Sequence, residues 1–264
     1  MTDATDNSRD GQPEPGRVAM VTGGGRGIGR EICYGLARAG RRVAVADLRS
    51  DDAEATATAI RAAGGKAIAV AMDVADSDSV VEGVHQVADE LGPVEILVNC
   101  AGWDELKPFL DTDEDFWDRI IEINYKGALR TTHACLPAMI ENKWGRIVNI
   151  GSDAGRVGSS LEAVYSGAKG GIIAFTKTIA REVARDGITA NTVCPGPTDT
   201  PLLGEITGAS DDGEKIIGAM ARAVPMKRLG QPDEVASAVV YFCSDQAGFV
   251  SGQTLSVSGG LTMA

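Results

Sequence analysis

From residue 17 onward, short apolar segments alternate with longer segments in which apolar residues recur at helical spacing. The short segments, which are typical of buried strands, span 18–22, 43–47, 67–72, 96–99, 147–151, 189–193 and 254–257. The segments between them predict helices over 28–39, 52–63, 77–91, 113–141, 162–185 and 232–243. Strands that are apolar on both faces and alternate with helices indicate a parallel sheet covered on both sides. We therefore predict one α/β, Rossmann-type, doubly wound domain over residues 16–264.

Two stretches do not follow this alternation. Residues 1–15 are polar and contain proline and glycine, which predicts a disordered tail. Residues 197–224, here called the lid segment, place Gly204, Gly208 and Gly213 between two short helical pieces. The segment is either a flexible lid over a ligand or a surface excursion. We predict a lid, because such insertions in compact domains are more often functional than idle.

Composition and charge exclude several classes of protein. The formal net charge of -12, with no basic stripe to offset it, argues against a nucleic-acid partner. Five scattered cysteines predict buried thiols in a reducing compartment, and with only His85 and His133 we expect no metal site. No signal peptide and no apolar run of membrane length is visible, so we expect a cytoplasmic protein that does not enter a membrane.

A glycine-rich turn follows the first predicted strand and opens the first predicted helix. Its residues are Gly23, Gly24, Gly25, Arg26, Gly27, Ile28 and Gly29. A strand, a glycine turn and a helix in this order direct backbone N–H groups and the positive helix end at a pyrophosphate. The alternative is a purely structural turn. We favour a dinucleotide site, although the spacing differs from the general G-x-G-x-x-G pattern.

Asp47 closes the second predicted strand, 18 residues after Gly29. A carboxylate there accepts hydrogen bonds from the adenine ribose and repels a 2′-phosphate. Leu48 adds no positive charge, and Arg49 lies farther along, so NAD is expected rather than NADP. The ends of the third and fourth strands should also line the cofactor site, because ligands of open α/β sheets bind beyond the carboxyl ends of the strands. The residues there are Asp73, Val74, Asn99, Ala101 and Gly102.

Tyr165 and Lys169 are four residues apart in a predicted helix, so their side chains share one face. A lysine ammonium beside a phenol favours the phenolate and is expected to lower the pKa of Tyr165 toward neutrality. Tyr165 would then act as a general acid or base. Ser152, just past the fifth predicted strand, is placed to hydrogen-bond a substrate oxygen. Asn124, within the predicted helix 113–141, is expected to disturb that helix and to hold a water near Lys169.

These motifs together resemble the short-chain dehydrogenase/reductase family over roughly residues 17–260. The residues that carry the resemblance are Thr22-Gly23-x-x-x-Gly27-x-Gly29, Asn99-Cys100-Ala101-Gly102, Asn124, Ser152, Tyr165-x-x-x-Lys169 and Pro195-Gly196. The resemblance implies a seven-stranded parallel sheet, a catalytic tetrad of Asn124, Ser152, Tyr165 and Lys169, and a homotetramer. It also implies that Lys169 contacts the nicotinamide ribose, and that Pro195, Gly196 and Thr198 or Thr200 hold the nicotinamide amide.

The substrate pocket is expected to lie between the fourth strand, the segment after Ser152 and the lid segment. Its residues would be Trp103, Asp104, Asp153, Val157, Ser159, Glu162, Pro197, Leu202, Leu203 and Ile206. Trp103 either covers the substrate or packs within its own loop. A basic entrance for a CoA group could come from Arg156, Lys215, Arg222 or Lys227, unless these are ordinary surface charges.

The segments 99–104, 152–165, 194–200 and 255–263 resemble dehydrogenases of 2-hydroxycyclohexanecarboxyl-CoA, an alicyclic β-hydroxyacyl-CoA. The resemblance extends to positions with no general family role. This resemblance and Asp47 imply oxidation of such a secondary alcohol with NAD. The alternatives are a 3-oxoacyl (acyl-carrier-protein) thioester reductase and a dehydrogenase of a free cyclic alcohol. A different class remains open as well, namely a nucleotide-binding protein that retains the fold without turnover.

Overall fold

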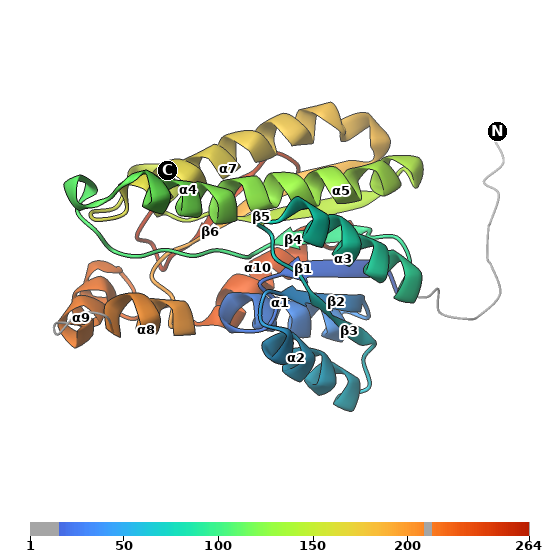
Figure 1. Cartoon of the computed structure of the whole chain (residues 1–264), viewed down its shortest axis with the longest axis horizontal. Coiled ribbons are helices and arrows are strands. Elements are labelled where there is room, and N and C mark those ends of the chain that lie inside the picture. The colour runs from blue at the N-terminus through green and yellow to red at the C-terminus, as the bar shows by residue number, and fades with distance from the viewer. Residues whose placement is uncertain (1–15, 209–212, 264) are drawn as a thin grey trace, which may run out of the picture.

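A computed structural model describes residues 16–208 and 213–263 of the chain (Figure 1). The predicted tail 1–15, and residues 209–212 of the lid segment, lie outside the described residues. The described part contains a seven-stranded parallel sheet in the order β3-β2-β1-β4-β5-β6-β7. Its strands are β1 (Val18–Thr22), β2 (Arg42–Asp47), β3 (Ala67–Ala71), β4 (Ile96–Asn99), β5 (Gly145–Ile150), β6 (Ile188–Pro195) and β7 (Thr254–Val257). The predicted doubly wound α/β fold is confirmed.

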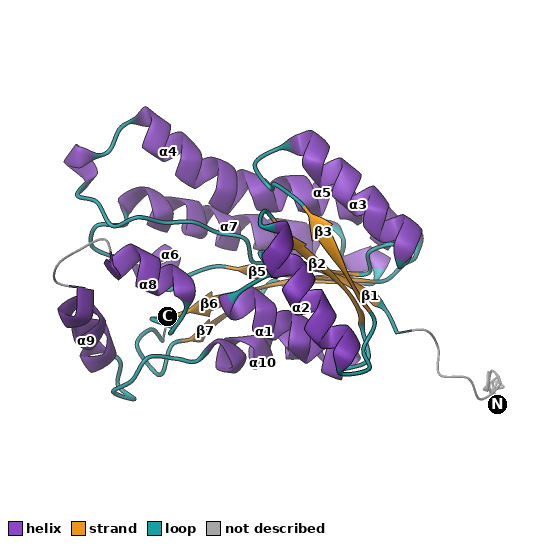
Figure 2. Ribbon diagram, turned by 60° about the horizontal axis from the view of Figure 1, so that its bottom comes forward, coloured by secondary structure: helices purple, strands orange, loops and turns teal. Residues whose placement is uncertain are grey.

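Helices cover both faces of this sheet (Figures 1 and 2). One layer holds α1 (Gly27–Arg38), α2 (Ser50–Ala62) and α10 (Pro232–Phe242), and the other holds α3 (Ser77–Glu90), α4 (Glu114–Ile121), α5 (Gly127–Glu141) and α7 (Ala163–Glu182). The short α6 (Ala154–Val157) follows β5. The lid segment contains α8 (Pro201–Gly208) and α9 (Gly213–Ala223), which agree with the two predicted helical pieces.

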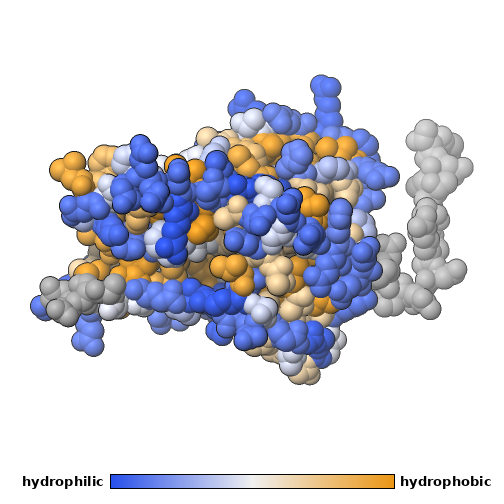
Figure 3. All heavy atoms as spheres, viewed as in Figure 1, coloured by the Kyte–Doolittle hydropathy of each residue, from blue (hydrophilic) through white to orange (hydrophobic). Residues whose placement is uncertain are grey.

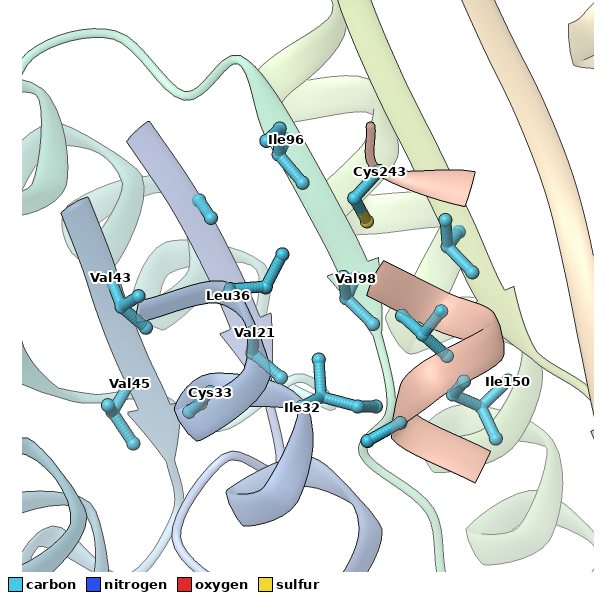
Figure 4. Close-up of a cluster of buried hydrophobic side chains, with 14 of the residues drawn as sticks. Val21, Ile32, Cys33, Leu36, Val43, Val45, Ile96, Val98, Ile150 and Cys243 are labelled. Atoms are coloured by element: carbon cyan, nitrogen blue, oxygen red, sulfur yellow. The ribbon is translucent and has the colours of Figure 1, made fainter. Parts of the chain in front are cut away.

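Each layer has its own apolar core against the sheet. On the α1 side, Ile32, Cys33 and Leu36 belong to one buried cluster with Val21 and Val45 of the sheet (Figure 4). All five are 1% exposed or less. Burying a side chain of this size contributes about 1.5–3 kcal/mol, so this contact face fixes α1 on the sheet. The start of α1 is thereby held at the end of β1.

The strand order reverses between β1 and β4, which lie side by side although β2 and β3 come between them in the sequence. Chains leave β1 and β4 toward opposite faces at this point, and ligands of open α/β sheets bind in the resulting crevice. The face of the molecule in Figure 3 is mostly hydrophilic, and hydrophobic residues are visible on it in the region between α4 and α8. The fold therefore places the glycine turn, the end of β4 and the lid segment around one edge of the sheet.

The predicted helix 113–141 is not continuous. The five residues Glu122–Lys126 form a π-helical turn between α4 and α5. Asn124 in this turn is buried, and its amide donates to the Trp103 carbonyl at 2.7 Å and to the Ile120 carbonyl at 3.0 Å. Its Oδ1 accepts from the Trp103 N–H at 3.3 Å. The widened turn allows the Asn124 amide to form hydrogen bonds with the loop after β4. This agrees with the expectation that Asn124 disturbs the helix.

Asn124→Ala should lower the free energy of unfolding by about 1–3 kcal/mol, because buried backbone groups lose their partner. Equilibrium urea unfolding followed by circular dichroism measures this change. Asn142→Ala, at the exposed end of α5, is the matched control and should change the free energy of unfolding by less than about 0.5 kcal/mol. Equal stability of the Asn124→Ala variant and the unsubstituted protein would contradict the structural role of this amide.

Candidate active site

The glycine turn forms a cradle at the start of α1. Gly23 has a φ of 65°, and a Cβ on Gly29 would lie 2.0 Å from the Gly23 carbonyl oxygen. Arg26 precedes α1 without capping it, and the first turn of the helix holds no acidic side chain. Backbone N–H groups at this helix end therefore face outward without a side-chain acceptor. The cradle fits the pyrophosphate of a dinucleotide.

Asp47 lies at the carboxyl end of β2, against this cradle. The carboxylate accepts from the Gly25 N–H at 2.9 Å and from the Arg49 N–H at 3.0 Å, and the side chain is buried. Two backbone bonds fix the direction of the carboxylate and leave lone pairs for further donors. Leu48, which follows it, is 70% exposed. The arrangement suits the hydroxyl groups of a ribose, which are donors to such a carboxylate.

Arg26 reaches away from the cradle to the lid segment. Its guanidinium forms two hydrogen bonds with the Glu205 carboxylate of α8, one of them at 2.9 Å. The beginning of α8 also lies close, because a Cβ on Gly27 would contact Pro201 and Thr200 at 3.6 and 3.7 Å. The lid segment therefore rests on the glycine turn in this structure.

The segment after β6 carries the residues expected to hold a nicotinamide amide. The Thr198 hydroxyl donates to the Gly196 carbonyl at 2.9 Å, and the Thr200 hydroxyl accepts from the Leu203 N–H at 3.1 Å. Thr200 thus caps the first turn of α8. Pro195 ends β6, and a Cβ on Gly196 would lie 2.7 Å from Ser258. These residues fix the start of the lid segment beside the sheet edge.

The end of β4 is joined to the glycine turn by a threonine that the sequence-based site did not include. The Thr22 hydroxyl accepts from the Cys100 N–H at 3.1 Å and from the Ala101 N–H at 3.2 Å. A Cβ on Gly102 would lie 3.0 Å from the Asn124 amide oxygen and 3.6 Å from Lys169 Nζ. The backbone at Ala101 and Gly102 therefore lies between the glycine turn and the predicted tetrad.

Asn99 uses its side chain inside the protein. Its amide donates to the Asn149 side chain at 2.8 Å and accepts from the Thr131 hydroxyl at 2.6 Å. Asn149 in turn donates to the Thr176 hydroxyl of α7 at 2.8 Å. This buried chain of polar groups ties α5 and α7 to the ends of β4 and β5. A cofactor contact by Asn99 would have to come from its backbone.

Asp73 and Val74 follow β3 rather than ending it, since β3 stops at Ala71. The Asp73 carboxylate accepts from the Ala75 N–H at 2.8 Å, while the Asp73 N–H donates to the Ser79 hydroxyl at 2.9 Å. Val74 is buried and contacts Gly127 at the start of α5. The pair shapes the turn into α3.

The four predicted tetrad residues come together at the carboxyl edge. Lys169 is buried, donates to the Ile150 carbonyl at 3.0 Å, and places Nζ 5.5 Å from the centre of the Tyr165 ring. Ser152 lies near the Tyr165 phenol and acts to lower its pKa. A small cavity is lined by both Asn124 and Lys169. That cavity is where the sequence-based interpretation requires a water.

The expected lowering of the phenol pKa is wrong for this structure. Burial, and then the nearby Asp104 and Glu162 carboxyls, raise the pKa of Tyr165, although Ser152 acts in the other direction. Burial also lowers the pKa of Lys169. Buried groups resist ionisation because water no longer solvates their charge. The lysine therefore does not make this phenol acidic by itself.

The residues predicted for the substrate pocket have different surroundings. The Trp103 ring contacts Phe116 edge-to-face at 5.8 Å, and the Arg119 guanidinium lies 3.7 Å from its centre. This packing favours the structural role of Trp103. Asp153 is buried and accepts from the Ser256 hydroxyl, so its carboxylate faces β7. Val157 is 63% exposed, while Glu162 and Leu202 are half-buried.

A second pocket lies in front of Tyr165 and includes Asp104, one of the residues predicted for the substrate pocket. It is lined by Asp104, Phe116, Leu161, Glu162 and Tyr165, among others. Asp104 directly follows Trp103, but nothing in the sequence shows that its side chain is buried. The proposed basic entrance gains little support: Arg156 donates to Ser256 at 2.7 Å, and Lys227 donates to the Arg222 carbonyl at 2.8 Å.

No helix among the described residues is both long enough and apolar enough to cross a membrane. Within the same residues, no group of three or more metal-ligating side chains converges. The five cysteines are free thiols, and all but Cys100 are buried.

Comparison with known proteins matches residues 23–262 to the family described as Enoyl-(Acyl carrier protein) reductase. The chain is 40% identical to an acetoacetyl-CoA reductase of Shinella zoogloeoides, over 92% of this chain and 98% of that protein. It is 39% identical to a 2,3-dihydroxy-2,3-dihydro-p-cumate dehydrogenase of Pseudomonas putida, over 97% and 98%. A crystal structure of an actinorhodin polyketide ketoreductase variant with NADPH superposes with a TM-score of 0.89, at 37% identity over 93% of this chain and 97% of that one.

Proposed function

The chain belongs to the short-chain dehydrogenase/reductase family, and from this premise we propose that it is an NAD-dependent oxidoreductase that interconverts a secondary alcohol and a ketone. The observation that carries the proposal is the meeting of Ser152, Tyr165 and Lys169 at the sheet edge beside the glycine cradle. A bound nicotinamide dinucleotide would supply or accept the hydride. The residues of the chain would manage the proton and the position of the substrate.

In this proposal Ser152 and Tyr165 both hydrogen-bond the substrate oxygen. During ketone reduction the phenol gives its proton to that oxygen as the carbonyl carbon receives the hydride, and the reverse transfer accompanies alcohol oxidation. Lys169 stabilises the phenolate that remains after reduction, because its ammonium lies on the same helix face. Asn124 and Lys169 line the cavity through which a water would return the proton.

The preference for NAD is supported by Asp47. Its carboxylate is held against Gly25 and Arg49, so a 2′-phosphate on the ribose would meet a fixed negative charge. The structural neighbour binds NADPH, which makes the cofactor a point to be measured for this chain. The other contacts proposed for the cofactor are Gly23, Arg26, Gly27, Ile28, Gly29, Leu48, Asp73, Val74, Asn99, Ala101, Gly102, Pro195, Gly196, Thr198 and Thr200.

We propose an acyl thioester as the substrate, with 2-hydroxycyclohexanecarboxyl-CoA as the first candidate. Relatives named as acetoacetyl-CoA and 3-oxoacyl-carrier-protein reductases support a thioester. They equally support the alternative of a 3-oxoacyl thioester reductase. The relative named as a dihydrodiol dehydrogenase favours the second alternative, a free cyclic alcohol. Contacts from Glu162, Leu202 and Val157 belong to this proposal, whereas the packing of Trp103 and Asp153 argues against direct contacts by these two.

A homotetramer is also proposed, since β7 is an edge strand and exposed apolar residues lie on or after it. Leu255, Leu261 and Met263 are 42%, 39% and 87% exposed. Covering such a patch is favourable because apolar surface leaves water. Light scattering during size exclusion measures the subunit number directly.

Turnover on a matched panel tests the proposed substrate. The panel pairs 2-hydroxycyclohexanecarboxyl-CoA and 3-hydroxyacyl-CoAs with the corresponding free acids and with free cyclic alcohols, each with NAD and NADP. We expect kcat/KM to be highest for a CoA thioester with NAD. A higher value for the free alcohols would exclude the thioester, and NADH binding without turnover of any substrate would favour the non-catalytic class.

Tyr165→Phe should lower kcat about 10²–10⁴-fold, because only the proton donor is removed. The Kd for NADH, measured by fluorescence, should stay within about twofold of the unsubstituted value. A twofold change in Kd is a much smaller difference in binding free energy than the 1.4 kcal/mol of a tenfold change. Tyr241→Phe, at a half-exposed tyrosine of α10, is the control and should leave both quantities unchanged. Substantial kcat in the Tyr165→Phe variant would show that another group transfers the proton.

Asp47→Ala should weaken NAD binding by about 1–3 kcal/mol and should raise the relative affinity for NADP. Asp47→Asn keeps one acceptor oxygen for the backbone and therefore separates the loss of charge from the loss of loop order. Isothermal titration with both cofactors gives the two affinities. Asp51→Ala, on the exposed start of α2, controls for general charge effects. An unchanged ratio of NAD to NADP affinity in both Asp47 variants would refute this assignment.

A further inference from the structure

The Asp104 carboxyl is buried beside the proposed tetrad without its own set of donors. The side chain is 5% exposed, and no donor among the described residues reaches its Oδ2. The Glu105 N–H favours the carboxylate form of Asp104, and the neighbouring Glu162 carboxyl disfavours it. A buried carboxylate with an unsatisfied oxygen next to a second carboxyl is costly unless a proton lies between them.

The backbone holds these two carboxyls together. The Lys107 N–H donates to the Leu161 carbonyl at 3.0 Å, which joins the loop of Asp104 to the start of α7. Leu161 has a φ of 69°, in the left-handed region that costs a side-chain-bearing residue about 1–3 kcal/mol. Glu162 is the N-cap residue of α7, yet its side chain makes no capping bond. The Glu162 side chain instead lines the same pocket as Asp104.

Both carboxyls line the same pocket as Tyr165. Glu162 lies one helical turn before Tyr165, and Lys169 lies one turn after it, so the phenol has acidic groups on one side and the ammonium on the other. The Cys100 thiol at the end of β4 also raises the pKa of the phenol, and Ser152 after β5 lowers it.

The Lys169 ammonium also acts on Asp104 and favours its carboxylate form, against the effects of burial and of Glu162. The other cations near Asp104 have partners elsewhere. Lys107 is paired with Glu105 at 2.9 Å, and Arg119 of α4 lies over the Trp103 ring. Burial in the first place, and then Glu162, raise the pKa of Asp104 to about 8. The same two carboxyls follow burial as causes of the raised pKa of Tyr165.

We propose that Asp104 and Glu162 share one proton at neutral pH and act as positioning residues that keep the Tyr165 phenol protonated. The phenol is the form that donates a proton to a ketone, so the pair favours reduction near neutral pH. When the pair loses its proton in alkaline solution it carries two negative charges, and phenolate formation, which alcohol oxidation needs, becomes harder. The effect on reduction and oxidation rests on the proposed function of Tyr165, whereas the proton shared by Asp104 and Glu162 does not.

Thermal unfolding at several pH values tests the shared proton without any turnover. A carboxyl whose folded-state pKa is raised destabilises the fold increasingly as pH rises from its unfolded value, near 4, through about 8. Asp104→Asn keeps one oxygen acceptor beside the Glu105 N–H and offers Glu162 a donor. Its Tm should therefore rise relative to the unsubstituted protein between pH 5 and pH 9. Glu105→Gln, on the same loop, is the matched control and should show a constant difference.

The ionisation of Tyr165 gives a second readout. Absorbance at 295 nm follows phenolate formation, and subtracting the titration of Tyr165→Phe isolates this one phenol among the four tyrosines. Asp104→Asn and Glu162→Gln should each lower the pKa of the phenol by about one unit, and the double variant should lower it further, because each removes one negative charge. The pH profile of kcat for oxidation should move to lower pH by the same amount.

The outcomes separate the two proposals. A Tm difference between Asp104→Asn and the unsubstituted protein that is independent of pH would overturn the shared proton. A pH-dependent Tm difference together with an unchanged phenol titration in both single variants would overturn the influence on Tyr165. If both readouts change as expected but no alcohol or ketone is turned over, the proposed function fails while the carboxyl pair stands.

Discussion

The candidate active site at the carboxyl edge of the sheet depends on a row of polar residues at the ends of three parallel strands. The register pairs Thr22 of β1 with Asn99 of β4, and Asn99 with Asn149 of β5. Each of the three then bonds outward: Thr22 to the turn after β4, Asn99 to α5, and Asn149 to Thr176 of α7. Because α7 carries Tyr165 and Lys169, one set of buried hydrogen bonds fixes their height above the sheet.

This row also explains why an apolar sheet ends in buried polar groups. A buried amide without partners costs about 1–3 kcal/mol, but here each amide finds side-chain partners on neighbouring elements. A shift of one residue in the pairing of β4 with β5 would separate Asn99 from Asn149. The network therefore selects one register, and with it one position for α7 relative to the glycine cradle.

The sequence predicted the sheet and most helix ends, because apolar periodicity and glycine turns are local signals. Strands at 18–22, 96–99 and 254–257 agree with β1, β4 and β7. The break in 113–141 was anticipated only as a disturbance at Asn124, since a π-turn arises from contacts with the distant Trp103 backbone. Asp104 shows the same limit: its burial depends on α4 and α7 packing around a loop, and no spacing along the chain encodes that.

The charges around the Tyr165 phenol show why the spacing between Tyr165 and Lys169 alone predicted the wrong direction for the pKa of the phenol. The spacing between Tyr165 and Lys169 gives one cation on the correct helix face, and considered alone it predicts an acidic phenol. Folding removes water from both groups, which disfavours the charged form of each and weakens the cation that was to act on the phenol. It also brings Asp104 from a loop 61 positions away in sequence to the same pocket. Burial and a residue outside the family motif therefore both act on the protonation of the phenol, and the four tetrad residues alone do not contain either contribution.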